Sequence, residues 1–363
     1  MAGDRTALID VIVPVHDPAR SLERTLSSLR MSTAMQVGTD LAVTVVCHNV
    51  PAEDIRQTLS PDASTEVSFI ELHDGIYSPA GPKNFGFAET SSCYVSFIDS
   101  DDYLEPGALD AWLQMAESQA LSAVIPVERH SDGRLIRTPP IRPWNRRSLN
   151  GVRDRLAYRT APLGLLRREA IDRLGIAFTP GLATGEDQQF TAELWFSAER
   201  VAYARHAPAY IVGDDASGRV TLATRSMEEE LRGAATLLSS NWFRGRTLAE
   251  RRSIAIKTVR VHVFGASLAR SSVGSWTPAD RVYLSAFLAS LDTIAPGYER
   301  PFSLADRRLL DALRDPESAD SGILRLAGDR RRFGHPATLL SRSIRGQFAV
   351  EGPLRFMGAS ALM

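Results

Sequence analysis

The sequence is poor in cysteine and has no long apolar run. Only Cys47 and Cys93 occur among its 363 residues, which excludes a disulfide-stabilised scaffold and leaves too few thiols for a cysteine-ligated zinc site. No stretch reaches the roughly 18 apolar residues that a membrane-spanning helix needs, and the N-terminus lacks a basic segment followed by a long apolar one. These absences predict a cytoplasmic protein, and they leave peripheral contact with the inner face of the cell membrane open.

The chain also lacks an excess of charge of either sign, because 42 basic residues stand against 43 acidic ones. This balance excludes a globally basic nucleic-acid-binding protein, and we expect no nucleic-acid partner. The balance is nevertheless a sum of two unequal parts: residues 1–224 hold 21 basic and 29 acidic side chains, and residues 225–363 hold 21 and 14. With 44% apolar residues, the chain is long enough for one large domain or two ordinary ones.

Short β-rich runs alternate with helical periods in the N-terminal part of the chain. Asp17 and Pro18 suit the N-cap and first position of a helix that ends near Met31. We expect strands at residues 8–15, 41–48, 67–72, 94–98 and 201–204, helices at 83–90 and 109–116, and a loop that opens a helix at 184–196. This pattern predicts an α/β fold, with a mainly parallel sheet covered by helices on both faces. From about residue 225 helical periods take over, so we expect an α/β domain at 1–224 and a helical domain at 225–363.

Three carboxylates follow the expected strand at 94–98 without a gap. Asp99, Asp101 and Asp102 therefore lie at the carboxyl edge of the parallel sheet, where ligands bind in open α/β folds. Hard oxygen donors without histidine or cysteine suit Mg²⁺ or Mn²⁺ that already carries a diphosphate. The alternative interpretation is that Asp99 caps a turn and that the other two are solvated at the start of the next helix.

Two further segments place polar groups at expected helix N-termini. Glu186 and Asp187 follow a glycine and begin a helix, so that a carboxylate there can act as a general base for an acceptor hydroxyl. An ordinary first-turn cap, favoured by the helix dipole, is the competing interpretation. Lys83 lies in a Gly- and Pro-rich loop at 74–86, where it can hold a phosphate or a nucleobase oxygen or can be simply solvated.

The four segments 9–29, 81–110, 164–175 and 184–190, in this order and with this spacing, resemble the GT-A glycosyltransferases of family 2. These are inverting enzymes that use nucleotide sugars, and the resemblance covers about residues 8–215. It implies a GT-A fold and transfer of a sugar from a nucleotide-diphosphate sugar, with a UDP-sugar expected. The acceptor would be a hydroxyl of a glycan, a wall polymer or a lipid-linked molecule, and the metal Mn²⁺ or Mg²⁺.

The resemblance also assigns roles to single residues. It implies that Asp187 is the catalytic base, with Glu186 beside it, and that Asp101 binds the metal that bridges the diphosphate. Asp99 would contact the ribose or uridine side and Asp102 would support the same site. Pro14, Lys83 and Asn84 match positions that lie near the nucleotide in this family.

One segment departs from the family pattern. After the second strand the family has two acidic residues followed by Gly and Ser, whereas this chain has Val46-Cys47-His48-Asn49-Val50. His48 or Asn49 can hydrogen-bond a pyrimidine instead, or Asp74 can supply an acid from a neighbouring loop. Three hypotheses stay open: UDP is held differently, another nucleotide is used, or the chain is a non-catalytic GT-A-like binding or scaffold protein with a degenerate nucleotide pocket.

The segment at 212–221 occupies the place where related enzymes carry a loop that closes over the diphosphate, and Ser217 and Arg219 are candidate contacts there. A nucleotidyltransferase is the other enzyme class that we considered. It would need a Gly-rich, basic phosphate loop after the first strand, and the segment PVHDPARS offers only Arg20.

The last 140 residues bear on acceptor and location more than on chemistry. The aromatic side chains between Trp242 and Phe287 have the spacing of helix-core residues. Between Arg330 and Phe356 basic and apolar side chains alternate, which is typical of a solvated helix face and also of a segment that lies on an anionic membrane. Self-association into a homo-oligomer through this region is a further hypothesis.

Overall fold

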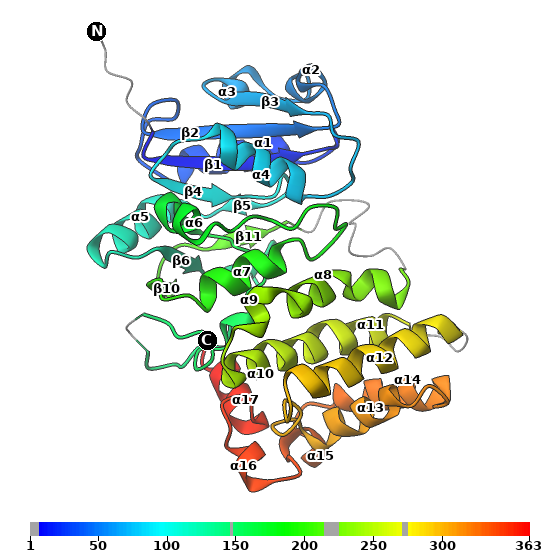
Figure 1. The fold of residues 1–363 in the computed structure, drawn as a ribbon. Coiled ribbons are helices and arrows are strands. Elements are labelled where there is room, and N and C mark those ends of the chain that lie inside the picture. The colour runs from blue at the N-terminus through cyan, green and yellow to red at the C-terminus, as the bar shows by residue number, and fades with distance from the viewer. Residues whose placement is uncertain (1–6, 146–147, 214–224, 271–274) are drawn as a thin grey trace. The chain divides into compact units, whose positions relative to one another are not determined.

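A computed structural model describes residues 7–145, 148–213, 225–270 and 275–363 (Figure 1). The chain divides into two compact units. The sheet unit comprises Met1–Thr138, Arg146–Leu149 and Thr160–Thr221, and the helical unit comprises Pro139–Asn145, Asn150–Arg159 and Leu222–Met363. Two short segments from the middle of the sequence therefore fold with the C-terminal part of the chain.

The described part of the sheet unit contains a seven-stranded sheet in the order β10-β6-β9-β4-β1-β2-β3. Strand β9 runs antiparallel to both of its neighbours, and the other pairs are parallel. The strands are β1 (Ile9–Val15), β2 (Leu41–His48), β3 (Ser68–Leu72), β4 (Tyr94–Phe97), β6 (Ala123–Pro126), β9 (Leu165–Arg167) and β10 (Val201–Ala204). The predicted mixed, mainly parallel α/β fold is thus confirmed.

A second, small sheet has the order β5-β11-β7-β8. Its strands are β5 (Tyr103–Leu104), β7 (Glu128–His130), β8 (Leu135–Ile136) and β11 (Tyr210–Val212). Strand β5 immediately follows the acidic segment at 99–102, and β11 pairs with it antiparallel. The small sheet therefore brings the residues after Tyr210 next to the three clustered carboxylates.

The helices of the sheet unit pack against these strands, as the blue to green part of Figure 1 shows. They are α1 (Leu22–Met31), α2 (Ala52–Arg56), α3 (Pro61–Ser64), α4 (Ala80–Glu89), α5 (Ala108–Ser118), α6 (Arg168–Leu174) and α7 (Asp187–Trp195). Helix α4 lies close to β1 and β2 because it has a glycine at the contact. A Cβ atom on Gly86 would come within 2.6 Å of Ile12 and 3.0 Å of Val46.

Two helices begin elsewhere than the sequence indicates. Helix α1 begins at Leu22, not at Pro18, because Asp17 makes a turn of its own: its Oδ1 accepts from the amide of Ala19 at 2.9 Å. This turn leaves Arg20 outside the helix. Helix α4 begins at Ala80, so Lys83 lies in its first turn and not at its first position.

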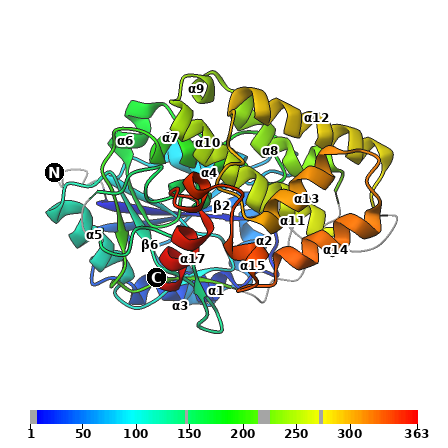
Figure 2. The same cartoon turned by 90° about the horizontal axis from the view of Figure 1, so that it is seen from below.

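The described part of the helical unit contains the 3₁₀ turn η1 (Leu156–Tyr158), the π-helical segment η3 (Thr258–Val263) and ten α-helices. These helices are α8 (Met227–Ser239), α9 (Asn241–Arg244), α10 (Leu248–Lys257), α11 (Phe264–Ala269), α12 (Pro278–Ile294), α13 (Leu304–Arg314), α14 (Asp320–Arg330), α15 (Pro336–Leu339), α16 (Ile344–Gln347) and α17 (Pro353–Ala361). Figure 2 shows α13 beside α12 and α14, in agreement with their contacts. None of the helices in the described residues is long and apolar enough to cross a membrane.

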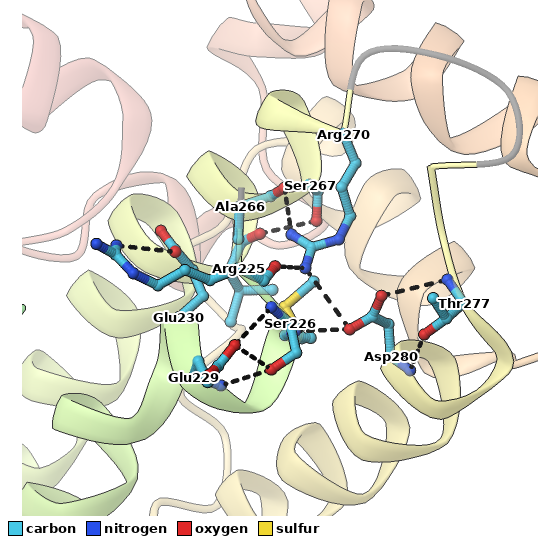
Figure 3. Close-up of polar contacts among 11 residues, drawn as sticks. Arg225, Ser226, Glu229, Glu230, Ala266, Ser267, Arg270, Thr277 and Asp280 are labelled. Carbon is cyan, nitrogen blue, oxygen red and sulfur yellow. Dashed lines mark hydrogen bonds and ion pairs between the residues drawn. The ribbon is translucent and has the colours of Figure 1, made fainter. Parts of the chain in front are cut away.

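A buried carboxylate joins three helix ends of the helical unit (Figure 3). Asp280, in the first turn of α12, accepts from the amide of Met227 at the start of α8 at 2.6 Å. The guanidinium of Arg270 lies 3.6 Å from the same carboxylate and donates to the carbonyls of Arg225 and Ala266. Asp280 also forms a capping box with Thr277, so each of its two carboxylate oxygens accepts from a backbone amide.

A second buried network holds the segment 150–159 to the end of the chain. Arg155 donates to the carbonyls of Pro140 and Val350. Arg260, in the π-helical segment, donates to Glu351 Oε2 at 3.2 Å and to the hydroxyl of Tyr158 at the same distance. These contacts explain why the middle segments fold with the helical unit.

Candidate active site

The loops that carry the predicted site residues open on one edge of the large sheet. Strands β4, β1, β2 and β3 are parallel neighbours, so their carboxyl ends lie together. The acidic segment follows β4, the Asp17 turn follows β1, His48 ends β2, and Asp74 follows β3. This edge is where open α/β sheets bind their ligands.

Lys83, on α4, lies among carboxylates that come from two other segments, the one after β4 and the start of α7. Its Nζ donates to Glu186 Oε1 at 3.2 Å and lies 3.7 Å from Asp99 Oδ1. Burial alone would lower the pKa of Lys83. The carboxylates of Asp99, Glu186 and Asp187 raise this pKa by more than burial lowers it, so the pKa of Lys83 is higher than usual. The structure therefore brings Lys83 together with Asp99 and with the Gly185-Glu186-Asp187 segment.

Asp187 is the first residue of α7 and is half-buried beside this cluster. An aromatic packing arrangement fixes the helix start: Phe190 stacks on Phe178 with ring centroids 4.6 Å apart, and Phe97 meets Phe178 edge-on at 5.0 Å. Lys83 lies over the same Phe178 ring. Glu186 is buried and accepts a hydrogen bond from Lys83, whereas Asp187 is more exposed. A general base has to be accessible to its substrate, so Asp187 is the better placed of the two carboxylates.

The other carboxylates of the acidic segment have separate partners. Asp101 Oδ2 accepts from Arg20 Nη1 at 2.9 Å, and its carbonyl accepts from Arg24 at 2.6 Å. Asp102 accepts from the hydroxyl of Tyr210 at 2.6 Å and from the amide of Gly213 at 2.9 Å. Burial first, and the charge of Asp99 second, raise the pKa of Asp102 above its usual range.

Arg20 and Tyr210 are functional candidates that the sequence did not single out. Arg20 is near in sequence to the first strand, but only the Asp17 turn directs it toward Asp101. Tyr210 reaches Asp102 because β11 pairs with β5, a pairing between strands that are about a hundred residues apart and carry no local signal.

The acidic segment fits a divalent cation by the chemistry of its donors, since Mg²⁺ that carries a diphosphate uses one or two carboxylates together with phosphate oxygens and water. In the arrangement described, its three carboxylates point to different partners. The described residues contain no cluster of three or more acidic, histidine or cysteine side chains that could hold a metal. Asp99, with about half of its side chain exposed, and Asp101 are the residues that would hold the cation.

At the end of β2 the structure brings together the residues that replace the family's acidic pair. His48 Nε2 lies 2.9 Å from Asp74 Oδ1, and Asn49 Nδ2 donates to the same oxygen at 3.4 Å. Asn49 adopts a left-handed backbone conformation, and its Oδ1 accepts from the amide of Gly75. An acid from the neighbouring loop is thus placed beside His48 and Asn49, one of the arrangements that the sequence left open.

The remaining predicted residues have different surroundings. Asn84 exchanges two hydrogen bonds of 2.9 Å with the backbone of Phe178, so it holds the segment before α7 in place. Pro14 lies half-buried near the end of β1, opposite Val46 of β2. Ser217 and Arg219 lie outside the residues that the structure describes.

Comparison of the sequence with known proteins finds similarity to glycosyltransferases. The family described as "Glycosyltransferase like family 2" matches residues 39–128. The poly(ribitol-phosphate) beta-N-acetylglucosaminyltransferase TarP of Staphylococcus aureus is 24% identical over 210 residues, which are 57% of this chain and 63% of TarP. The poly(ribitol-phosphate) beta-glucosyltransferase of Bacillus spizizenii is 21% identical over 53% of this chain and 30% of that protein.

Among solved structures, S. aureus TarS residues 1–349 in complex with UDP-GlcNAc superimposes with a TM-score of 0.68, at 16% identity, over 89% of this chain and 91% of the TarS chain. At this identity the likeness concerns the fold, which is therefore of the GT-A class. With the family match and the order of the motifs, these findings confirm the predicted resemblance to the family 2 glycosyltransferases. The chain spans about 30 to 63% of the length of the curated relatives it matches.

Proposed function

We propose that the chain is an inverting glycosyltransferase that moves a sugar from a UDP-sugar to a hydroxyl of a polymeric acceptor. The observation that carries this proposal is the joint position of Asp99, Lys83, Glu186 and Asp187 at the carboxyl edge of the sheet. Family 2 enzymes place their nucleotide and their base there. The UDP-GlcNAc complex of a protein with the same fold supports the choice of donor.

In this proposal Asp187 takes the proton of the acceptor hydroxyl, so that the hydroxyl oxygen can attack the anomeric carbon from the side opposite the diphosphate. Glu186 and Asp99 keep Lys83 charged and fixed beside the leaving group. His48, Asn49 and Asp74 recognise the base in place of the family's acidic pair. A divalent cation held by Asp99 and Asp101 would offset the charge of the departing diphosphate.

The acceptor belongs to the class of polyol-phosphate wall polymers. The two named relatives act on poly(ribitol-phosphate), one with N-acetylglucosamine and the other with glucose. We propose that the sheet unit performs the transfer and that the helical unit serves the acceptor. A cytoplasmic location, membrane contact and self-association remain predictions.

Calorimetry with UDP-, GDP- and CDP-sugars, with and without Mn²⁺, tests the donor, and mass spectrometry of poly(ribitol phosphate) after incubation tests the transfer. We expect tight binding of a UDP-sugar that is strengthened by Mn²⁺, and a mass increase of one sugar per modified unit. Binding of none of the nucleotide sugars would contradict the proposal and would favour the scaffold hypothesis.

A further inference from the structure

The helical unit contains a cavity that its predicted role does not require. It has a volume of about 840 Å³, a size typical of ligand sites. Its walls come from α10, the turn before α13, α13 itself and the segment around α16, which Figure 1 shows in yellow to red. Five arginines lie in its lining: Arg252, Arg300, Arg307, Arg342 and Arg345.

Only some of these arginines have acidic partners. Arg307 lies 3.5 Å from Glu299, and Arg342 lies 2.8 Å from Asp311. Among the described residues, the guanidinium groups of Arg252, Arg300 and Arg345 form no ion pair with a carboxylate. Glu351, the other acidic residue in the lining, is occupied by Arg260. The cavity therefore has an excess of positive charge.

Two of the unpaired guanidinium groups meet at a glycine. A Cβ atom on Gly297 would lie 2.9 Å from Nε of Arg300 and 3.2 Å from Nη2 of Arg252. Burial lowers the pKa of Arg252, and the charge of Arg300 lowers it further. Two like charges held this close repel each other, and an anion bound between them would remove the repulsion.

One residue of the cavity lining has a buried hydroxyl group without a hydrogen-bond partner. Ser253, on α10, is 2% exposed, and its hydroxyl makes no hydrogen bond among the described residues. A buried hydroxyl of this kind costs free energy unless a ligand supplies the missing partner. This hydroxyl itself has almost no exposed surface, so the charged groups of the lining that can bind a ligand are the arginines.

We propose that this cavity binds phosphate groups of a phosphodiester chain. The planar guanidinium group matches phosphate oxygens in a two-pronged geometry, and several arginines along one cavity suit a ligand with repeated phosphates. The choice of a polyol-phosphate chain as the source of these groups rests on the proposed function. The site thus holds the acceptor polymer through its backbone phosphates and not through its sugars.

The test is fluorescence anisotropy with labelled poly(ribitol phosphate) and the full chain. We expect the double variant Arg300→Ala/Arg345→Ala to bind the polymer about 10- to 100-fold more weakly, since each charged hydrogen bond contributes on the order of a tenfold factor. Arg308→Ala is the matched control, because Arg308 is exposed on α13 and does not line the cavity. We expect wild-type polymer binding from it. The affinity for UDP-GlcNAc should be unchanged in all three proteins, which also shows that they are folded.

Competition with other anions tests whether the cavity recognises phosphate, and the transfer assay distinguishes failure of the cavity assignment from failure of the proposed activity. Inorganic phosphate at millimolar concentration should compete with the polymer in the wild type and not in the double variant. Equal polymer affinity of the double variant and the wild type would overturn the proposal, and so would binding to anionic phospholipid vesicles without binding to the polymer. If the wild type binds polymer in this way but transfers no sugar, the cavity assignment stands and the proposed activity fails.

Discussion

The two units of the chain gather charge of opposite sign. At the sheet edge, Asp99, Glu186 and Asp187 surround a single buried cation, Lys83. In the helical unit, a cavity gathers five arginines and only two carboxylates, Glu299 and Glu351. The nearly neutral net charge of the chain is therefore the sum of two local excesses of opposite sign.

This difference matches two ligand chemistries. A site with surplus carboxylates can take a divalent cation and a proton from a hydroxyl, and a site with surplus guanidinium groups can take phosphates. Five predictions test which of the charged groups outside the cavity act in the reaction and which stabilise the fold.

The largest effect is expected at Asp187, the proposed general base. Asp187→Asn should lower the transfer rate by about 10³-fold, within the range that a general base contributes, because the amide cannot accept the acceptor's proton. Initial rates with a UDP-sugar and a polymeric acceptor measure this loss, and calorimetry should give an unchanged nucleotide affinity. Asp54→Asn, at an exposed position on α2, is the control. A wild-type rate in Asp187→Asn would assign the base elsewhere.

Removing the positive charge of Lys83 should destabilise the sheet unit. In Lys83→Met the carboxylates of Asp99 and Glu186 lose their buried partner, and breaking a buried pair costs about 3 to 5 kcal/mol. Urea denaturation measures the loss. The double variant Lys83→Met/Glu186→Gln should regain part of it, because one of the uncompensated charges is gone. Equal stability of the two variants would show that Lys83 and Glu186 are not coupled.

Removing the carboxylate of Asp280 should destabilise the helical unit by nearly as much as the loss of Lys83 destabilises the sheet unit. Asp280→Ala leaves the amide of Met227 without its acceptor and Arg270 without a nearby counter-charge, which should cost about 3 kcal/mol. Thermal unfolding of Asp280→Ala against Asp280→Asn separates the two parts, since the amide keeps an acceptor oxygen. If both variants melt like the wild type, the network is not a stabilising one.

The buried carboxylate of Asp10 should make the stability of the sheet unit depend on pH. Burial is the main cause that raises the pKa of Asp10 to about 6, and the hydrogen bond from Thr44 opposes it. Because the folded pKa exceeds the unfolded one, Asp10 reduces stability as the pH rises from about 4 through 6, by about 2 to 3 kcal/mol. Asp10→Asn should remove this decrease. Denaturation at pH 4 and pH 8 checks it, and equal pH dependence in both proteins would place the effect on another group.

The smallest effect is expected on the affinity for Mn²⁺. Arg20→Gln removes the guanidinium that occupies Asp101, so we expect Mn²⁺ to bind several-fold more tightly in the presence of UDP. Calorimetry of Mn²⁺ into the UDP-saturated protein measures the change. Arg30→Gln, in the last turn of α1 and with backbone carbonyls as partners, is the control. Weaker Mn²⁺ binding in Arg20→Gln would mean that Arg20 itself holds the diphosphate.

Most of the sheet could be predicted because its strands carry local signals. The second strand and the last one, at 201–204, have the predicted bounds, since turn residues delimit them on both sides. Helix starts were harder: Asp17 offers the N-cap signal, but its side chain closes a turn with Ala19, and the helix begins at Leu22. A cap and a turn use the same residue types, so only the three-dimensional structure distinguishes them.

The candidate site was predictable where it depends on motifs and not where it depends on pairing across the chain. Lys83 and Glu186 are 103 positions apart, yet both belong to family motifs. Tyr210 reaches Asp102 through a short strand pairing, and Arg20 reaches Asp101 through a turn. Neither contact has a sequence signature. The arginine cavity was missed for a similar reason, because its residues come from four separate segments.

The contact between Arg155 and Val350 has a consequence for the order in which the molecule forms. The two residues are 195 positions apart, so at roughly 5 to 20 residues per second the ribosome delivers the second about 10 to 40 s after the first. During that interval the strands on either side of the 139–159 region are already available to pair. The segment itself has to wait, with its arginine exposed to water, until almost the whole chain has emerged. A protein shortened before residue 350 would keep this segment permanently without its partner.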